Sequence, residues 1–233
     1  MTLNIIYEDN HIIVVEKPAG ILSQAGSLDL LDMLTEIKAF LKEKYQKPGN
    51  VFLGLVHRLD TNVGGIMVFA KTSKAASRLS KEIRNHTFKK KYLAVVQGHM
   101  QVGKSHELID YLSKDEEKKL AYITDQIFGK KSELNFEVLA NKIINKKEYT
   151  LIDIKLETGR FHQIRAQLSK FGHPIYNDGK YGESIEGFNL GLFSYEISFI
   201  HPISHIEVKY HLMPKTDIFV QFKESIKILE EKL

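Results

Sequence analysis

Two apolar runs enclose a polar loop in the stretch Val51-Phe52-Leu53-Gly54-Leu55-Val56-His57-Arg58-Leu59-Asp60-Thr61-Asn62-Val63-Gly64-Gly65-Ile66-Met67-Val68-Phe69-Ala70. The runs, residues 51–56 and 66–70, have the length and composition of buried strands. The nine residues between them end on a glycine pair and must form a loop or a tight connection. This stretch therefore predicts two buried strands with Arg58 and Asp60 in the loop that joins them.

Three other segments have the apolar spacing of amphipathic helices. The first covers residues 29–44. The second begins after Thr72 or Ser73, either of which can cap it. The third follows Gly159-Arg160 and ends at Gly172. Their expected core positions are Leu30, Leu34, Ile37 and Leu41, then Ala75, Leu79 and Ile83, then Ile164, Leu168 and Phe171.

The remaining patterns indicate strands mixed with helices. Strand character marks residues 12–15, 92–96, 149–156, 196–199 and 206–212, whereas the charged residues 104–119 are expected to form an exposed excursion. Helices and strands do not alternate regularly, which favours an α+β fold over a doubly wound α/β fold. The length of 233 residues fits one domain or two closely joined halves.

The composition excludes several kinds of chemistry. The chain has no cysteine, so a thiolate nucleophile, a disulfide or a cysteine-bound zinc is excluded. No apolar stretch is long enough to span a membrane, and the first residues lack a signal-peptide pattern, so we expect a cytoplasmic protein. The ten histidines include no His-Glu-x-x-His arrangement, and no glycine-rich phosphate loop is present, so we expect no metal and no cofactor.

Positive charge is concentrated in one segment. Residues 71–91 contain eight Lys or Arg against one acid, Glu82, which is a local +7 on a chain of net charge +4. A basic patch on a nearly balanced chain is typical of an RNA-binding face, although a solvated lysine-rich helix has the same pattern. The helical spacing places one set of side chains on a shared face: Lys71, Lys74, Arg78 and Lys81.

Three polar groups stand out against the apolar background. They are His57-Arg58-Leu59-Asp60, Lys91-Tyr92, and Gly159-Arg160-Phe161-His162-Gln163-Ile164-Arg165. Taken singly, each has an ordinary structural interpretation, as a surface ion pair, a strand tyrosine or a helix-surface arginine. Taken together and in this order, they resemble the signature motifs of the RluA family of pseudouridine synthases. The resemblance extends to residues 7–20, 68–71, 91–98, 172–182 and 201–202.

The resemblance implies a fold and a reaction. It implies a mixed, mostly antiparallel sheet in two halves with a catalytic cleft between them, as a single catalytic domain over residues 1–233. It implies that the protein isomerises uridine in RNA to pseudouridine. It makes Asp60 the essential carboxylate and Arg165 its cationic partner in an ion pair. It makes Tyr92 the active-site tyrosine, whose ring stacks on uracil and whose hydroxyl helps to remove the C5 proton.

The resemblance also implies how RNA is bound. Arg58 would fill the gap left by a flipped uridine, and His162 would contact RNA or orient its loop. The basic face of Lys71, Lys74, Arg78 and Lys81 would follow phosphates. Related enzymes modify ribosomal or transfer RNA, and we expect a monomer that lacks the accessory RNA-binding domain of many relatives.

The sequence departs from the family pattern at a few positions. Val63-Gly64-Gly65 stands where the family usually has Thr-Ser-Gly, Phe161 where it has Thr, Gln167 where it has His, and Asn177 where it commonly has Gly. Because these positions surround the motifs, they bear on the shape of the uridine pocket and on the choice of substrate.

Two other functions compete with this interpretation. A catalytically silent RNA-binding module or RNA chaperone would not need Asp60, Tyr92 and Arg165 together. A glycosidase or nucleoside hydrolase would need a second acid near Asp60, and no motif supplies one. A single catalytic assay separates the first alternative from an enzyme.

Overall fold

A computed structural model describes residues 2–26, 31–187, 189–215 and 217–233. The chain divides into two compact units. The first unit contains Met1–Lys89 and Glu196–Leu212, and the second contains Lys90–Tyr195 and Met213–Leu233. The strand β10 (Leu192–Ile200) passes from the second unit to the first between Tyr195 and Glu196.

The first unit is built on antiparallel strands. β1 (Ile5–Glu8) pairs with β2 (Ile12–Lys17), and β2 pairs with β4 (Gly64–Ala70). The two-residue strand β3 (Gly54–Leu55) also pairs with β4, and β11 (Glu207–His211) pairs with β10. All seven residues of β4 are buried, as expected for a central strand with apolar side chains on both faces.

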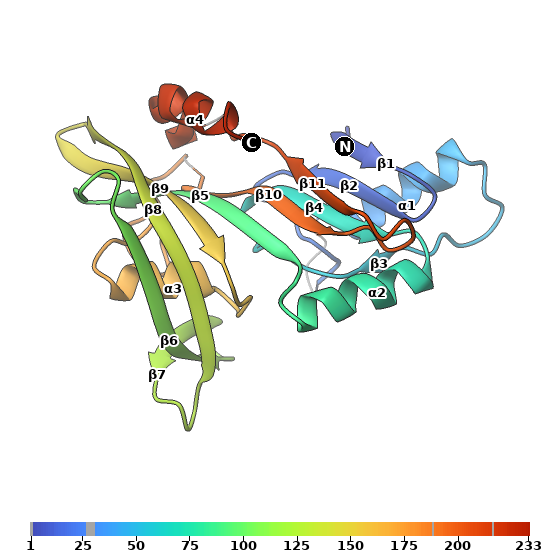
Figure 1. Cartoon of the computed structure of the whole chain (residues 1–233), viewed down its shortest axis with the longest axis horizontal. Coiled ribbons are helices and arrows are strands. Elements are labelled where there is room, and N and C mark those ends of the chain that lie inside the picture. Colours follow the sequence, from blue (N-terminus) through green and yellow to red (C-terminus); the bar gives the residue numbers. More distant parts are fainter. Residues whose placement is uncertain (1, 27–30, 188, 216) are drawn as a thin grey trace. The chain divides into compact units, whose positions relative to one another are not determined.

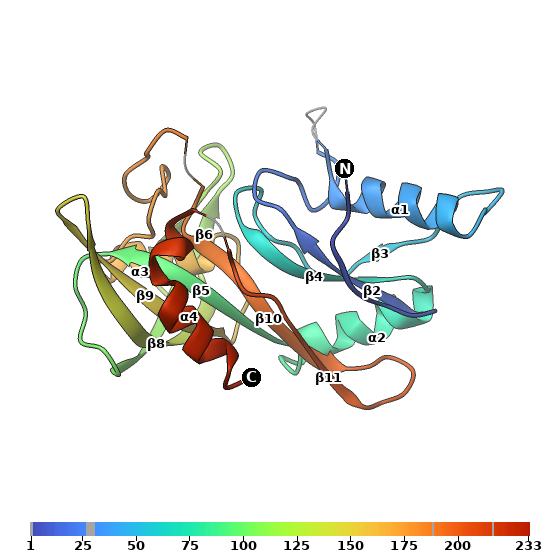
Figure 2. The same ribbon diagram turned by 90° about the horizontal axis from the view of Figure 1, so that it is seen from above.

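Two helices cover this sheet. α1 (Met33–Lys44) begins at Asp32, whose side chain accepts a hydrogen bond from the Thr35 N–H at 3.0 Å. α2 (Ser73–Arg84) begins at Thr72, which caps the Ala75 N–H at 3.2 Å. Figure 1 labels both helices, and Figure 2 shows β3 between them. One face of α2 packs with β2, β4 and β10 in a core that contains Ile12, Val14, Ile66, Val68, Ala75, Leu79, Ile197 and Phe199.

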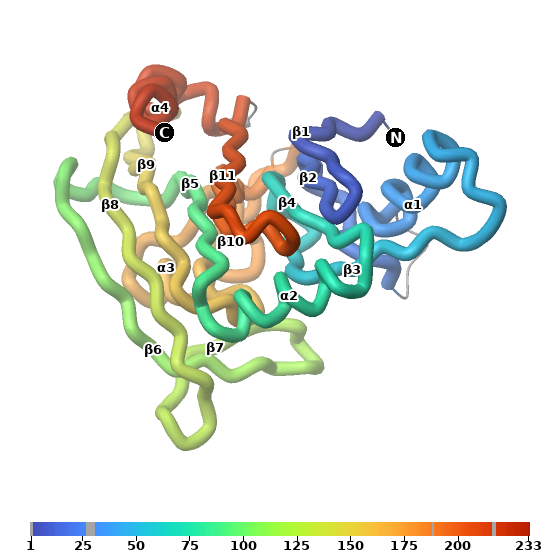
Figure 3. Tube along the Cα trace, turned by 45° about the vertical axis from the view of Figure 1, so that its right-hand side comes forward, coloured from blue at the N-terminus to red at the C-terminus, as the bar shows by residue number. Residues whose placement is uncertain are grey.

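The second unit is a more strongly curved antiparallel sheet. Its strand order is β5-β9-β8-β6-β7. In Figure 3, β6 and β8 run side by side along the unit toward the short edge strand β7. The bounds are β5 (Lys89–Gln97), β6 (Ser105–Asp115), β7 (Leu120–Thr124), β8 (Lys130–Ile144) and β9 (Lys147–Leu156).

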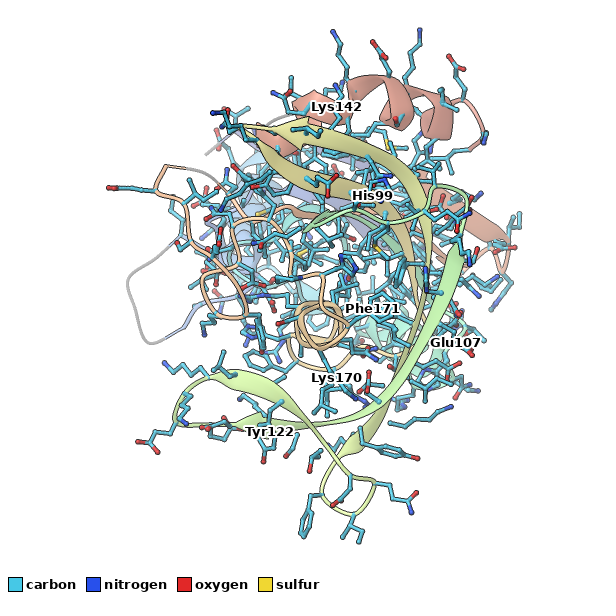
Figure 4. All side chains as sticks on the ribbon, turned by 90° about the vertical axis from the view of Figure 1, so that its left-hand side faces the viewer. His99, Glu107, Tyr122, Lys142, Lys170 and Phe171 are labelled. Carbon is cyan, nitrogen blue, oxygen red and sulfur yellow. The ribbon has the colours of Figure 1, made fainter. Side chains whose placement is uncertain are left out.

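Helices pack on this second sheet. α3 (Gln163–Lys170) lies against β6 and β7, and Figure 4 shows it nearly end-on with Lys170 and Phe171 at its end. The 3₁₀ helix η1 (Asp217–Phe222) and α4 (Lys223–Glu230) pack on β5 and β9. Their shared core contains Leu93, Tyr149, Leu151, Tyr195, Phe219, Phe222 and Ile226.

The α+β class is confirmed, and helices lie at the three predicted places. The first begins at Met33 with Asp32 as its cap, which is later than predicted, and Phe171, an expected core position, is 37% exposed. Thr72 is the cap of α2, and α3 ends before Gly172, which has a φ of +95°. The predicted residues Asp29 and Leu30 lie outside the described part of the chain. Of the helices in the described ranges, none is long and apolar enough to cross a membrane.

One prediction about strands is wrong, and one strand was not predicted. Of residues 51–56, only Gly54 and Leu55 form a strand, because only these two pair with β4. Most of residues 104–119, expected to be an exposed excursion, form β6, whose residues are exposed or half-buried except Leu112. A strand with so many polar and charged residues on its open face resembles a loop in composition.

Candidate active site

Asp60 lies in the loop between β3 and β4, and hydrogen bonds hold this loop on both sides of it. Before Asp60, the Ser23 hydroxyl accepts the Leu59 N–H at 3.1 Å and donates to the Leu59 carbonyl at 2.8 Å. After Asp60, the Thr61 carbonyl accepts from the Lys17 ammonium at 3.0 Å. The loop therefore presents the Asp60 carboxylate from a fixed backbone, as a reactive group requires.

Lys17 is a fully buried cation at the end of β2. Its Nζ donates to the carbonyl oxygens of Pro18 at 2.9 Å, Ile21 at 2.6 Å and Thr61 at 3.0 Å. Burial lowers the pKa of Lys17 from 10.5 to about 8, while the negative charge of Asp60 acts to raise it. The negative charge of Asp60 therefore favours the charged form of the buried Lys17 ammonium.

The two residues that begin the loop have different surroundings. His57 is buried, its Nε2 accepts the Val68 N–H of β4 at 3.1 Å, and its ring lies 5.4 Å from that of Phe88. It therefore anchors the loop to the central strand. Arg58 is exposed. An exposed arginine two residues before Asp60 fits the predicted contact with RNA, and that contact stays a prediction.

In the second unit, Arg165 forms a buried two-point ion pair with Asp178. Its Nε donates to Asp178 Oδ2 at 2.8 Å and its NH2 group to Oδ1 at 2.7 Å. The Asp178 side chain is 0% exposed, and its Oδ1 also accepts the Lys180 N–H at 3.1 Å. Two parallel hydrogen bonds to one carboxylate fix the plane of a guanidinium group. Arg165 therefore has a single, well-determined orientation on α3.

The turn before α3 is fixed by a buried glutamine. Gln163 Oε1 accepts from the Arg160 N–H at 3.0 Å and the Thr158 hydroxyl at 2.9 Å, and its Nε2 donates to the Glu133 carbonyl of β8 at 3.2 Å. His162, just before it, is buried and has a left-handed backbone with φ of +49°. Left-handed geometry is uncommon outside glycine, although histidine tolerates it better than most residues.

Tyr92 is buried in the middle of β5, where it pairs with Ile154 of β9. It belongs to the same unit as Arg165 and His162. A buried strand tyrosine is compatible with a structural role as well as with stacking on a base, so the catalytic role of Tyr92 stays a prediction.

Some residues of the predicted basic face have partners within the protein, and others are exposed. Lys71 is one of those with internal partners. Its side chain is 9% exposed, and its Nζ lies 2.6 Å from Glu8 Oε1. Burial raises the pKa of Glu8, but hydrogen bonds from Lys44, Lys71 and Tyr45 outweigh it and bring the pKa to about 2. Lys71 is therefore part of an ion-pair network that joins β4 to β1.

Of the remaining three residues of the basic face, one has a partner within the protein and two are exposed. The Arg78 guanidinium donates to the carbonyl of Pro202, so it links α2 to the segment after β10. Lys74 and Lys81 are exposed on α2. These two lysines are the members of the predicted set that are best placed to follow phosphates.

The predicted site residues therefore fall in both units. Arg58, Asp60 and the α2 side chains belong to the first unit, whereas Tyr92, His162 and Arg165 belong to the second. The ion pair between Asp60 and Arg165 stays a prediction. Within the second unit Arg165 forms an ion pair with Asp178, which lies in the matching sequence segment 172–182 but to which we assigned no role.

Sequence reasoning missed two further charged residues of this site. Lys17 lies beyond the predicted strand 12–15, although the alternation of β2 places it on the same face as Ile13 and Val15. That register was the available signal for a buried lysine. Asp178 lies thirteen residues after Arg165 in a loop, and no local pattern links the two.

Metal binding gains no support from the geometry. In the described ranges, no group of three or more His, Asp or Glu side chains is arranged to hold a metal ion.

Comparison with known proteins shows the family. The family model for RNA pseudouridylate synthase matches residues 11–170, which include Asp60, Tyr92 and Arg165. Ribosomal large subunit pseudouridine synthase D of Zymomonas mobilis is 31% identical over 95% of this chain and 72% of that protein. The dual-specificity RNA pseudouridine synthase RluA of Haemophilus influenzae is 33% identical over 87% of this chain and 89% of its own length.

The fold agrees with these similarities. The solved structure of human RNA pseudouridylate synthase domain containing 1 has a TM-score of 0.72 to this chain, covering 97% of this chain and 95% of that one at 19% identity. The ordered motifs, the matched family model and the shared fold lead to one conclusion: the chain belongs to the RNA pseudouridylate synthase family and is an RNA pseudouridine synthase of the RluA type.

Proposed function

We propose that Asp60 is the carboxylate on which the isomerisation of uridine depends. The observation that carries this proposal is the loop around Asp60. It is held before the aspartate by Ser23 and after it by Lys17, and it places a buried positive charge close to the carboxylate. A carboxylate fixed in this way is prepared to act as a nucleophile or a base in its ionised form.

The reaction itself needs no external group. The bond from ribose C1′ to uracil N1 breaks, the uracil turns, and a new bond forms from C1′ to C5. The C5 hydrogen then leaves as a proton, while N1 gains one. Atoms and electrons balance within the nucleotide, so no oxidant, reductant or group donor enters. The protein has to supply a carboxylate, a place for the turning base and a route for the proton.

Tyr92 and Arg165 are the side chains that we assign to the base and to the charge. The Tyr92 ring would stack on uracil, and its hydroxyl would assist removal of the C5 proton. Arg165 would stabilise negative charge during the reaction. It is suited to this because the two-point contact with Asp178 leaves its guanidinium in one orientation.

RNA contact would involve the exposed cations of the first unit. Arg58 would occupy the space of the uridine that leaves the stack, and His162 of the second unit would contact RNA or orient its turn. Lys74 and Lys81 would follow the phosphates. Lys71 and Arg78, which the sequence groups with them, have internal partners and would contribute less.

The substrate we propose is a structured ribosomal or transfer RNA, modified in the cytoplasm by a monomer. Support comes from the names of the relatives, among which are a ribosomal large subunit pseudouridine synthase and a dual-specificity RNA pseudouridine synthase. The two units would act together as one catalytic domain.

Mapping of pseudouridine in the host tests this proposal. Total RNA from the parent strain, a deletion strain, and deletion strains that carry wild-type or Asp60→Asn protein would be mapped at single-nucleotide resolution. We expect one or a few sites in ribosomal or transfer RNA to disappear on deletion. The wild-type protein should restore them and Asp60→Asn should not. Restoration by Asp60→Asn would refute the role of Asp60, and sites lost only from other RNAs would refute the substrate class.

A further inference from the structure

Tyr181 connects four parts of the second unit around Arg165. Its ring lies 5.2 Å from the guanidinium carbon of Arg165 and forms an edge contact with the His162 ring at 5.6 Å. Its hydroxyl lies 2.7 Å from the Ala121 nitrogen of β7 and 3.0 Å from His162 Nδ1. The ring also packs into a small apolar core of Leu112, Ala121 and Ala166.

Chemistry fixes the direction of one of the two hydrogen bonds of the Tyr181 hydroxyl. The Ala121 N–H can only donate, so the hydroxyl oxygen is the acceptor in that bond. The second bond joins the hydroxyl to His162 Nδ1 at 3.0 Å, and its direction depends on the tautomer of His162. When Tyr181 donates to Nδ1, the neutral His162 ring must carry its hydrogen on Nε2.

His162 has little freedom to escape this arrangement. Its backbone is left-handed with φ of +49°, and its ring stacks on Phe161 with centroids 3.9 Å apart and planes 18° from parallel. Phe161 in turn lies under the Lys114 ammonium of β6 at 5.0 Å from the ring centre. The His162 ring is thus held from one side by Phe161 and from the other by Tyr181.

We propose that Tyr181 is a positioning residue of the isomerase: its ring fixes the Arg165 guanidinium, and its hydroxyl fixes the tautomer of His162 and ties both to the edge of β7. This inference rests on the proposed function, since Arg165 and His162 are assigned to the reaction there. We assign Tyr181 no contact with uridine or the reacting atoms. Its effect on catalysis passes through the two side chains that it holds.

Two substitutions separate the contributions of ring and hydroxyl. Tyr181→Phe keeps the ring over Arg165 and removes the bonds to Ala121 and His162, whereas Tyr181→Leu removes both. Tyr195→Phe is the matched control, because it removes another tyrosine hydroxyl of the same unit, which bonds Asp153 at 2.9 Å. Thermal unfolding of all three variants measures any purely structural cost.

Single-turnover rates on RNA form the first readout. We expect Tyr181→Phe to slow pseudouridine formation about tenfold, with RNA affinity within about twofold of wild type. Tyr181→Leu should slow it about a hundredfold. Tyr195→Phe should keep the wild-type rate. If Tyr181→Phe is as fast as Tyr195→Phe, or if Tyr181→Leu is no slower than Tyr181→Phe, the proposal is wrong.

Nitrogen NMR of ¹⁵N-histidine protein is the second readout and needs no activity. The His162 signals, assigned with His162→Gln, should show the Nε2–H tautomer in wild type above pH 8 and lose this preference in Tyr181→Phe. A tautomer that is the same in both proteins would overturn the proposal. An enzyme that makes no pseudouridine while the tautomer changes as expected would instead refute the proposed function.

A double-substitution cycle completes the test. If the hydroxyl acts through His162, Tyr181→Phe should add nothing to the rate loss of His162→Gln. Rate losses that multiply in the double variant would show that Tyr181 does not act through His162.

Discussion

The region of the Asp60 loop and the region of the Arg165 helix each contain a buried cation, Lys17 and Arg165, and hold it in different ways. In the first unit, the buried Lys17 is held by three backbone carbonyl oxygens, and the negative charge of Asp60 acts on it through space. In the second unit, the buried Arg165 is held by two hydrogen bonds to the Asp178 carboxylate. Neutral dipoles therefore hold the first cation, and a charged group fixes the plane of the second.

This difference suits the two units to different roles in the proposed reaction. A guanidinium that bonds both oxygens of one carboxylate keeps a single orientation. Carbonyl oxygens hold an ammonium in place without a full opposite charge. In the proposed reaction, the first unit would supply the carboxylate on a fixed loop, and the second would supply a fixed positive charge.

The largest expected effect tests whether the two charges act in one step. Asp60→Asn and Arg165→Met should each reduce single-turnover pseudouridine formation by roughly a thousandfold or more. If both serve the same step, the double variant should be no slower than the slower single variant, because groups that act as a unit are not additive. Losses that multiply would mean that Asp60 and Arg165 act independently, and the predicted pairing would be wrong.

Breaking the ion pair between Arg165 and Asp178 should lower the stability of the protein. Asp178→Asn leaves the Arg165 guanidinium buried without its carboxylate, and we expect the free energy of unfolding to fall by about 3–5 kcal/mol in urea denaturation. Replacing both residues by apolar ones of similar size, Arg165→Met with Asp178→Leu, should recover most of this loss. If Asp178→Asn lowers the free energy of unfolding by less than about 1 kcal/mol, the ion pair between Arg165 and Asp178 is not formed in solution.

The buried charge of Lys17 should affect how the stability of the protein depends on pH. Because the folded pKa of Lys17 is lowered from 10.5 to about 8, its buried charge destabilises the protein fully below pH 8, and the penalty fades as pH rises toward 10.5. Relative to Lys17→Met, wild type should gain roughly 3 kcal/mol of unfolding free energy over this range. In Asp60→Asn the gain should begin at lower pH. Parallel pH profiles for wild type and Lys17→Met would contradict this account of Lys17.

The smallest effect concerns RNA affinity. Lys74→Ala and Lys81→Ala should each flatten the slope of log Kd against log salt by about 1, since each lysine releases about one counterion. Lys42→Ala, which removes an exposed lysine of α1, is the matched control and should leave the slope unchanged. Equal slopes for all four proteins, wild type included, would exclude α2 as the RNA-binding face.

The sequence was sufficient for the parts of the fold that depend on local patterns. The apolar run 66–70, a cap at Thr72 or Ser73 and the stop at Gly172 are local signals. The structure contains all three, with β4 starting two residues earlier and Thr72 as the cap. β6 was not predicted because it is rich in polar and charged residues and has one buried position, Leu112, so that its composition resembles that of a loop.

The candidate site was predictable only through its motifs. Asp60, Tyr92 and Arg165 stood out in the sequence, but their partners did not. Asp178 reaches Arg165 because a loop returns to α3, and this proximity is a property of the tertiary fold. The internal roles of Lys71 and Arg78 likewise depend on Glu8 and Pro202, which are far from them in the sequence.

The central claim is that the carboxylate of Asp60 is essential to an enzyme whose fold does not need it. Single-turnover pseudouridine formation by Asp60→Asn, on RNA from the deletion strain, tests this directly. We predict a rate at least roughly a thousandfold below wild type, with RNA affinity within about threefold and unchanged thermal unfolding. Pseudouridine formation by Asp60→Asn at a rate close to that of wild type would contradict the claim.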